Sequence, residues 1–442
     1  MVLNDFKKYA EVPPMGWNSW DCYANAVNEE QLLSAAGYIA ENLAEYGWEY
    51  IVCDIQWSEP YPSPDGYKSF TELCMDGYSR LIPAETRFPS CANGAGFKPI
   101  ADKIHSLGLK FGIHIMRGIP RQAVHAGTPI LADGKTARDI AADYSLCPWN
   151  NDMYGVDCTK DGAQEYYNSL FRLYASWGVD FVKCDDISNT EFRPDRPYSA
   201  EKEIEAIRRA IDLCGRKMVL SLSPGPAPVE NAPHLLKNAN MWRMSGDFWD
   251  NWEQLYNMFE LCKKWEGCSD LGCWPDCDMI PFGNLFTFGK RSKEEEDANI
   301  PRRRQSRFTR DEQVTLMTLW CIFRSPLMLG GVPESLDGFT LSLLKNKELI
   351  EMQKHSYGAR ECYRKRNGDI AWTACGENCR YLALFNTSPT GKAIRFDLSD
   401  ITMPGAEYSV LDMWSGEVFS STDAITARIN AHGARAFRIT LK

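Results

Sequence analysis

The stretch DFVKCDD at residues 180–186 combines an apolar, β-branched run with carboxylates at its end. The stretch WRMSGD at 242–247 repeats this arrangement further along the chain. Short apolar runs of this kind, bounded by turn residues, are typical of buried parallel strands. In a barrel of parallel strands, side chains at the carboxyl ends of the strands build the active site. We therefore expect Asp185 and Asp247 to lie where chemistry takes place.

Apolar strands of the same kind alternate with helical segments from residue 15 onward. The helical segments, such as 29–36, 164–173 and 309–320, carry apolar residues at every third or fourth position. Eight strands are predicted, at residues 15–20, 50–57, 110–116, 180–186, 218–223, 241–246, 273–280 and 326–331. Eight successive β-α units predict an α/β fold of the (β/α)8 TIM-barrel type.

The character of the sequence changes after the last helical segment. Alternating stretches such as IAWTA, YLALF and AFRITL follow, separated by Gly, Asn, Asp and Pro. Such alternation is typical of antiparallel sheets with one buried face. We predict a catalytic barrel over residues 1–355 and a smaller antiparallel β-sandwich over 356–442. The segments 57–97 and 117–160 are predicted to be long loops that help to build the site.

Length and charge limit the classes of partner. The chain has 442 residues, enough for a large barrel and a smaller domain, and a formal net charge of -10 at pH 7. Because binding to nucleic acid or anionic lipid needs clustered Lys and Arg, we expect neither partner, and instead a neutral small-molecule or oligosaccharide substrate. The triplet RRR at 302–304 follows the acidic run 294–297, so we interpret it as a solvated loop.

The N-terminal residues lack the apolar core of a signal peptide, and no window reaches the roughly 18 apolar residues of a membrane span. We therefore expect a cytoplasmic protein. Many of the 16 cysteines lie in apolar runs, where we expect mostly reduced, buried thiols. The group Cys262, Cys268, Cys273 and Cys277 lacks the paired CxxC spacing of a zinc site, so we predict no metal and no cofactor.

Each candidate carboxylate has a cation close to it in the sequence. Lys183 lies two residues before Asp185, and Arg243 lies four before Asp247. A retaining glycosidase needs one ionised carboxylate to attack the anomeric carbon and one protonated acid to donate to the leaving oxygen, roughly 5–5.5 Å apart. The predicted fourth and sixth strands lie two apart around the barrel, so their ends can face each other. This pattern suggests a glycosidase with two carboxylates.

Several motifs together resemble glycoside hydrolase family 27. They are PPMGWNSW at 13–20, the Asp and Trp of CDIQW at 53–57, KCDD at 183–186, RMSGD at 243–247, PDCDM at 275–279 and SPLMLGG at 325–331. The motifs occur in the family's order up to the predicted boundary, and the later part is similar to the family's β-sandwich in size and sequence pattern. The family contains α-galactosidases, α-N-acetylgalactosaminidases and β-L-arabinopyranosidases, which implies a glycosidase without a cofactor.

The resemblance makes Asp185 the nucleophile and Asp247 the acid/base. Lys183 shares a strand face with Asp185, where it could bind sugar hydroxyls and help to keep Asp185 ionised. Asp247 must hold its proton near neutrality, which nearby negative charge and apolar walls such as Phe248 and Trp249 would favour.

These assignments have alternatives. Asp186 is adjacent to Asp185, but strand alternation sends it to the opposite face, where it would cap a loop or pair with a base. Asp250 competes with Asp247, but it lies where the sequence has turned helical, which favours a surface or helix-cap role. Arg243 is either a plain salt-bridge residue or, as the resemblance implies, a contact of the substrate and the acid/base.

Further residues are predicted to line the sugar site. Trp20 offers an apolar face to a galactose-like ring, whereas Trp17 is expected in the core. Asp54 matches the family acid that accepts hydrogen bonds from sugar hydroxyls. Asp278 matches the family's late aspartate near the substrate, with a loop-capping role as its alternative. His114 stands where many relatives carry Tyr, and it is either structural or part of the pocket wall.

Two positions bear on the choice of sugar. In the family's α-galactosidases, a second aspartate usually occupies the position of Ile55 and holds the 4- and 6-hydroxyls. A sugar hydroxyl buried against Ile55 would lack a hydrogen-bond partner, which would cost about 1–3 kcal/mol of binding free energy. β-L-Arabinopyranose lacks C6 and its hydroxyl, so its binding would carry no such cost. Ser223 lies where those enzymes commonly carry Glu, and a smaller side chain would admit an N-acetyl group. We therefore rank β-L-arabinopyranosides first, α-D-galactosides second and N-acetylgalactosaminides third.

Two further alternatives concern the class of protein and its assembly. A carbohydrate-binding protein without turnover would also keep the pocket, although the presence of both carboxylates and their cations argues for an enzyme. The aromatic-rich loops fit either a substrate subsite or the interface of a homo-oligomer.

Overall fold

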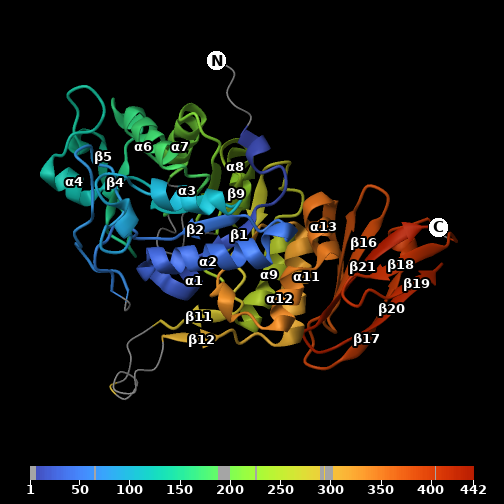
Figure 1. Ribbon diagram of the computed structural model, residues 1–442. Helices are drawn as coiled ribbons and strands as arrows, with labels where there is room; N and C mark the ends of the chain where they lie inside the picture. Colours follow the sequence, from blue (N-terminus) through green and yellow to red (C-terminus); the bar gives the residue numbers. More distant parts are fainter. Residues whose placement is uncertain are drawn as a thin grey trace.

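Strands and helices of the computed structural model form a barrel and, to one side of it, an antiparallel β domain, which is red in Figure 1. The structure describes residues 6–63, 66–187, 200–223, 226–288, 293, 302–403 and 405–442. The acidic run predicted at 294–297 lies outside these residues. The β domain packs against α11 (Arg310–Phe323), which contacts strands of its larger sheet.

The barrel strands are parallel throughout the described residues. They are β1 (Met15–Asn18), β2 (Tyr50–Cys53), β3 (Lys110–Met116), β7 (Phe181–Asp185), β8 (Val219–Leu222), β9 (Met241–Arg243), β10 (Trp274–Asp276) and β13 (Leu327–Leu329). Their order is β10-β9-β8-β7-β3-β2-β1-β13. A parallel bridge between Ile280 and Leu329 joins the segment after β10 to β13 and closes the barrel. The predicted TIM barrel is confirmed, and each strand lies within its predicted range.

Local capping explains where several helices begin and end. The barrel helices are α2 (Glu29–Asn42), α3 (Lys98–Ser106), α6 (Ala163–Trp177), α7 (Glu201–Leu213), α8 (Ala232–Asn238), α9 (Trp252–Lys264), α11, α12 (Gly338–Leu344) and α13 (Lys347–His355). Asn28 and Gln31 form a capping box before α2, and α11 begins with a capping box at Thr309. Gly178, at a φ of 87°, ends α6 in the left-handed region.

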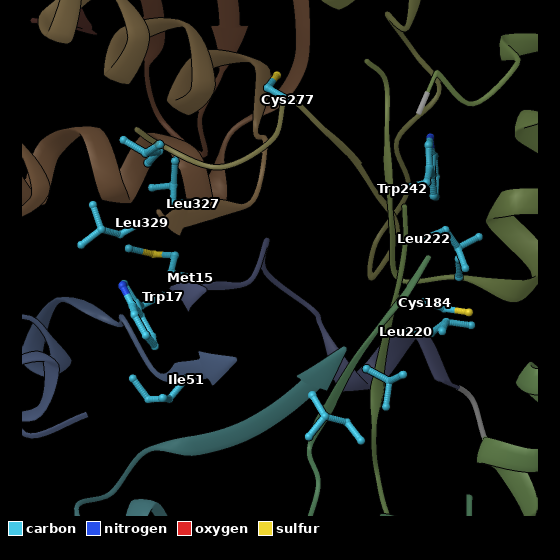
Figure 2. Close-up of a cluster of buried hydrophobic side chains, with 14 of the residues drawn as sticks. Met15, Trp17, Ile51, Cys184, Leu220, Leu222, Trp242, Cys277, Leu327 and Leu329 are labelled. Carbon is cyan, nitrogen blue, oxygen red and sulfur yellow. The ribbon is translucent and has the colours of Figure 1, made fainter. Parts of the chain in front are cut away.

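Strand alternation sorts the barrel side chains into two sets. The outward set packs against the helices in one buried cluster, part of which is shown in Figure 2, including Trp17 and Trp242. The inward set forms a separate cluster that fills the barrel, and it includes Tyr50, Val52, Phe181, Val219, Met241, Trp274 and Met328. Because Lys183 and Asp185 follow the alternation of Phe181, they lie inside the barrel, above this cluster.

The segment between β3 and β7 is more ordered than the predicted long loop over 117–160. It contains α4 (Arg121–Ala126), α5 (Ala137–Ile140) and three strands, β4 (Ile119–Pro120), β5 (Ala141–Leu146) and β6 (Met153–Val156). The strands form a small antiparallel sheet in the order β4-β6-β5. The prediction of a plain loop is wrong here, because these short strands are stabilised by pairing with one another and not by a long apolar run.

The C-terminal part contains two antiparallel sheets that enclose an apolar core of their own. The larger sheet has the order β14-β15-β16-β21-β18-β19, and β17 pairs with β20. The strands are β14 (Tyr357–Arg364), β15 (Asp369–Cys375), β16 (Arg380–Asn386), β17 (Lys392–Asp397), β18 (Tyr408–Asp412), β19 (Val418–Ser421), β20 (Ala424–Ile429) and β21 (Ala434–Leu441). The predicted β-sandwich is confirmed. The domain boundary at residue 355 stays a prediction.

The basic triplet at 302–304 is not a solvated loop. Arg303–Gln305 form β12, which pairs with β11 (Asn284–Phe286). The guanidinium of Arg304 makes two hydrogen bonds to the buried carboxylate of Asp250, at 2.5 and 2.8 Å. The prediction failed because the local sequence does not distinguish a basic run that is solvated from one that pairs with an acid in a distant segment.

The cysteines have free thiols, and all sixteen are described. The Sγ atoms of Cys262 and Cys277 lie 3.6 Å apart in the core, while Cys273 donates to the carbonyl of Leu236 and Cys268 to that of Glu266. Two of the four thiols therefore contact each other, and each of the other two contacts a different carbonyl. No helix in the described part of the chain has the length and apolar character needed to cross a bilayer.

Candidate active site

Asp185 lies at the end of β7, with its side chain 11% exposed. Nε2 of His114, on the neighbouring strand β3, lies 2.9 Å from its Oδ2, and the backbone N–H of Asp186 donates to its Oδ1 at 2.9 Å. Burial alone would raise the pKa of Asp185, but His114, Lys183 and this N–H hold it below its usual value. Asp185 is thus an oriented anion, and His114 contacts it directly.

Asp54 follows β2 and forms a second buried anion. Nζ of Lys183 lies 2.9 Å from its Oδ2, and Nδ2 of Asn18 donates to the same oxygen at 2.8 Å. The backbone N–H of Ile55 donates to its Oδ1 at 2.8 Å. Burial would raise the pKa of Asp54, but Lys183 and His114 lower it to about 2. The structure therefore gives Asp54 a basic partner that its sequence neighbourhood does not contain.

Arg243 lies at the end of β9 and links two more carboxylates. One of its Nη atoms lies 2.8 Å from Oδ2 of Asp278 and 3.3 Å from Oδ1 of Asp247. The side chains of Arg243 and Asp278 are each 3% exposed, whereas that of Asp247 is 52% exposed. Arg243 thus anchors a half-exposed acid to a buried one.

The surroundings of Asp247 differ from the prediction in one respect. The backbone N–H of Phe248 donates to Oδ2 of Asp278 at 2.7 Å, and the Phe248 ring lies 5.2 Å from that of Trp320 in the core. Phe248 therefore packs into the interior and does not wall Asp247. Trp249 makes an edge-to-face contact with Phe288 at 5.3 Å.

The two competing carboxylates have partners elsewhere. Asp186 pairs with Arg117 at 2.8 Å, in agreement with the expectation that it would pair with a base. Asp250 is buried and pairs with Arg304, so the predicted surface or helix-cap role is wrong. The side chain of Asn251, the next residue, caps α9 instead.

The two candidate catalytic carboxylates share electrostatic neighbours. Only β8 separates the strands β7 and β9 that lead to them. Burial would lower the pKa of the Arg243 guanidinium, but surrounding carboxylates raise it; these are Asp278, Asp247, Asp276 and Asp185. Asp185 and Asp247 therefore both raise the pKa of Arg243, which places them near one cation at the same end of the barrel. Their roles, and a carboxyl separation suited to double displacement, stay predictions.

Trp20 and Trp17 occupy different environments. Trp17 is fully buried and its Nε1 donates to the carbonyl of Gly331 at 2.8 Å, so its predicted core position is confirmed. Trp20 begins a short helix, α1 (Trp20–Tyr23), and does not continue the strand. Its ring stacks with Tyr67 at 6.3 Å and an interplanar angle of 13°.

Ile55 is 2% exposed and belongs to a small apolar cluster. The other members are Met116, Cys147 and Met153, and aromatic side chains from three segments pack against the cluster: Trp20, Tyr67 and Trp149. The position after Asp54 thus has an apolar side chain in an apolar environment. Tyr67 was not predicted, because it lies in an irregular segment with no periodic pattern.

Two further buried acids lie near Asp278. Asp276 accepts a hydrogen bond from the backbone N–H of Asp278 at 2.9 Å and shares a small cavity with Ser223. Burial, and then the charge of Asp278, raise the pKa of Asp276 to about 7. Burial also raises the pKa of Asp278, to about 6, and that of Asp21. Strand alternation from Asp278 could have identified Asp276, whereas nothing local identifies Asp21.

Asp276→Asn is expected to stabilise the protein at pH 8 and to have little effect at pH 4. The folded chain holds a proton on Asp276 up to a pKa of about 7, against an ordinary value of 3.8. Since the unfolded chain releases this proton at a lower pH than the folded chain does, the free energy of unfolding of the wild type falls as pH rises from about 4 to 7. The variant removes this penalty, on the order of 2–4 kcal/mol, and keeps the acceptor for the N–H of Asp278.

Urea unfolding of both proteins at pH 4, 6 and 8 measures this effect. A stability difference that stays constant across these pH values would contradict the prediction.

The chain is similar to known proteins over almost its whole length. Models described as "Alpha galactosidase A" and "Alpha galactosidase C-terminal beta sandwich domain" match residues 149–299 and 368–439. A β-L-arabinopyranosidase of Geobacillus stearothermophilus, solved in complex with arabinose, is 49% identical, with a TM-score of 0.92 and coverage of 99% of both chains. A protein of Bacillus halodurans C-125, proposed to be an α-N-acetylgalactosaminidase, is 47% identical, with a TM-score of 0.84 and coverage of 97% of both.

A curated α-galactosidase of Coffea arabica is 26% identical over 433 residues, which cover 97% of this chain and 93% of the relative. The barrel, the carboxylates at its strand ends and these relatives define a glycosidase that acts on carbohydrate. The chain belongs to glycoside hydrolase family 27.

Proposed function

We propose that the protein is a retaining exo-glycosidase that releases terminal β-L-arabinopyranosyl units, with a side activity on α-D-galactosides. In the first step, Asp185 attacks the anomeric carbon while Asp247 gives its proton to the leaving oxygen, which forms a glycosyl ester of Asp185 and the free aglycone. In the second step, Asp247 takes a proton from water, which attacks the same carbon and releases Asp185 as a carboxylate.

The difference in burial between the two carboxylates supports these roles. Asp185 is 11% exposed and held as an anion, which suits a nucleophile that must not be solvated. Asp247 is 52% exposed, which suits a group that must reach the aglycone and then water. Arg243 contacts Asp247, so it can keep that side chain over the site.

The second anion supports sugar binding. Asp54 is ionised, and Lys183 and Asn18 hold its Oδ2 from two sides. Lys183 can also donate to a sugar hydroxyl, since an ammonium carries three donors. Trp20 supplies the ring face on which the C–H surface of the sugar would stack.

Ile55 is the observation that most supports the choice of sugar. β-L-Arabinopyranose is α-D-galactopyranose without the hydroxymethyl group on C5. An apolar residue beside Asp54 offers that group no hydrogen bond, and it offers the smaller sugar an apolar wall. The 49% identical relative is described as a β-L-arabinopyranosidase, which supports the same choice.

Ile55→Asp is expected to raise the ratio of α-galactosidase to β-L-arabinopyranosidase kcat/KM by about 10- to 100-fold, because the new side chain offers acceptors to the 6-hydroxyl. Ile55→Asn tests the same hydrogen bonds without adding charge next to Asp54. Ile55→Val is the matched control and should leave the ratio unchanged. Initial rates on p-nitrophenyl glycosides measure the ratios, and equal ratios in all four proteins would exclude Ile55 as the determinant.

N-acetylgalactosaminides are the third-ranked candidate substrate, after α-D-galactosides. Ser223 is a small side chain where the family's α-galactosidases commonly carry Glu, and the 47% identical Bacillus protein is proposed to be an α-N-acetylgalactosaminidase. Rates on the p-nitrophenyl β-L-arabinopyranoside, α-D-galactopyranoside and N-acetyl-α-D-galactosaminide test the ranking. We expect the arabinopyranoside to be hydrolysed fastest. A fastest rate on the acetamido sugar would replace the proposal, and sugar binding without hydrolysis of any of them would favour a binding protein.

A further inference from the structure

Tyr67 lies in the segment after β2, and the mechanism above does not use it. Its ring stacks with Trp20 at 6.3 Å, with an interplanar angle of 13°. The ring of Trp149, from the segment between β5 and β6, also contacts Tyr67, with centroids 5.7 Å apart and an interplanar angle of 46°. Two rings from separate parts of the chain therefore fix the position of Tyr67.

The surroundings of Tyr67 place it beside the sugar site. The ring packs against the apolar cluster that contains Ile55 and Met116. Burial raises the pKa of the Tyr67 phenol, and the charges of three carboxylates raise it further; these are Asp185, Asp54 and Asp247. Tyr67 therefore packs against the cluster of Ile55 and lies within electrostatic reach of the proposed catalytic and sugar-binding anions.

We infer that Tyr67 is a second specificity-determining residue, whose ring, together with Ile55, occupies the space into which the C5 hydroxymethyl group of a galactoside would project. The inference rests on the proposed function. Carbons 4 and 5 of the sugar are adjacent, so a sugar whose 4-hydroxyl is bound near Asp54 directs its C5 substituent toward this cluster. Accommodating that group would require displacement of a ring that contacts both Trp20 and Trp149, and packed interiors resist such displacement.

The role of ring volume can be separated from that of the hydroxyl. Tyr67→Ala is expected to raise the ratio of α-galactosidase to β-L-arabinopyranosidase kcat/KM by about tenfold or more, since the space becomes available. Tyr67→Phe keeps the ring and should stay within about threefold of the wild-type ratio. Tyr61→Ala is the matched control, because Tyr61 lies in the same segment but is 71% exposed. Its ratio should equal that of the wild type.

A competition measurement gives a readout that does not depend on catalysis. The inhibition constant of D-galactose relative to that of L-arabinose should fall in Tyr67→Ala and stay unchanged in Tyr67→Phe. If Tyr67→Ala does not fold, Tyr67→Leu removes part of the ring volume and should shift both ratios in the same direction. A shift of equal size in Tyr67→Phe and Tyr67→Ala, or none in Tyr67→Ala, overturns the inference.

Failure of the inference differs from failure of the proposed function. A wild-type protein that prefers arabinopyranosides, with unchanged ratios in Tyr67→Ala, removes only the role of Tyr67. A wild-type protein that hydrolyses galactosides faster than arabinopyranosides overturns both. The double variant with Ile55→Asp adds a further check, because two residues that close the same space should give effects that do not multiply.

Discussion

Asp185→Asn is expected to lower kcat by at least about 10⁴-fold, because the amide cannot form the covalent glycosyl ester. Affinity for L-arabinose should stay within about threefold, since the side chain keeps its shape and its contact with His114. Stopped assays with p-nitrophenyl β-L-arabinopyranoside give kcat, and isothermal titration with L-arabinose gives the affinity. A variant with a near-normal rate would remove Asp185 from its proposed role.

The product formed by Asp185→Ala in the presence of azide identifies the nucleophile. Azide can occupy the space left by the carboxylate and attack the anomeric carbon once, so the glycosyl azide should have inverted configuration. Asp186→Asn is the matched control, because Asp186 pairs with Arg117 outside the site. It should lose stability but keep the kcat of its folded fraction. A loss of turnover in Asp186→Asn with a native fold would favour the neighbouring carboxylate instead.

Asp247→Ala is expected to lower kcat by about 10²- to 10⁴-fold, because water must then attack the glycosyl ester without a general base. With a 2,4-dinitrophenyl leaving group, which needs no protonation, the first step should remain fast and the glycosyl ester should accumulate. A burst of dinitrophenol followed by slow turnover measures this. Substrates with poor leaving groups should lose the first step as well, because no acid protonates the departing oxygen.

Azide again provides the diagnostic product. In Asp247→Ala it should attack the glycosyl ester, restore turnover and give a glycosyl azide of retained configuration, the opposite outcome to Asp185→Ala. Asp250→Asn is the control, since Asp250 forms a buried pair with Arg304. It should be less stable and yet turn over normally when folded. Absence of azide rescue in Asp247→Ala, combined with loss of turnover in Asp250→Asn, would reverse the assignment.

The exposure of Asp247 and the burial of its partner Arg243 determine which variants should fold normally. Asp247 is half exposed, and its partner Arg243 is buried beside Asp278. Truncation of Asp247 therefore leaves Arg243 paired, and the Asp247 variants should fold normally. Truncation of Arg243 would instead leave Asp278 without its cation in the interior, so it would confound loss of function with loss of stability.

The barrel could be predicted because its signals are local. Each strand is a short apolar run with turn residues around it, and alternation along DFVKCDD already places Lys183 and Asp185 on one face. The same rule separates Asp185 from Asp186, whose partner is Arg117. Composition and alternation likewise identified the β-sandwich. Family motifs added the remaining candidate positions, whose roles await the variants above.

Tertiary structure decided which of these side chains meet. The ion pair of Lys183 with Asp54 and the contact of His114 with Asp185 join residues on different strands, so they depend on strand order and register in the closed barrel. The pair of Asp250 with Arg304 and the stack of Tyr67 on Trp20 depend on where the irregular segments pack against the barrel. Local propensity and periodicity carry no information about such contacts, because burial and pairing between distant segments are properties of the packed molecule.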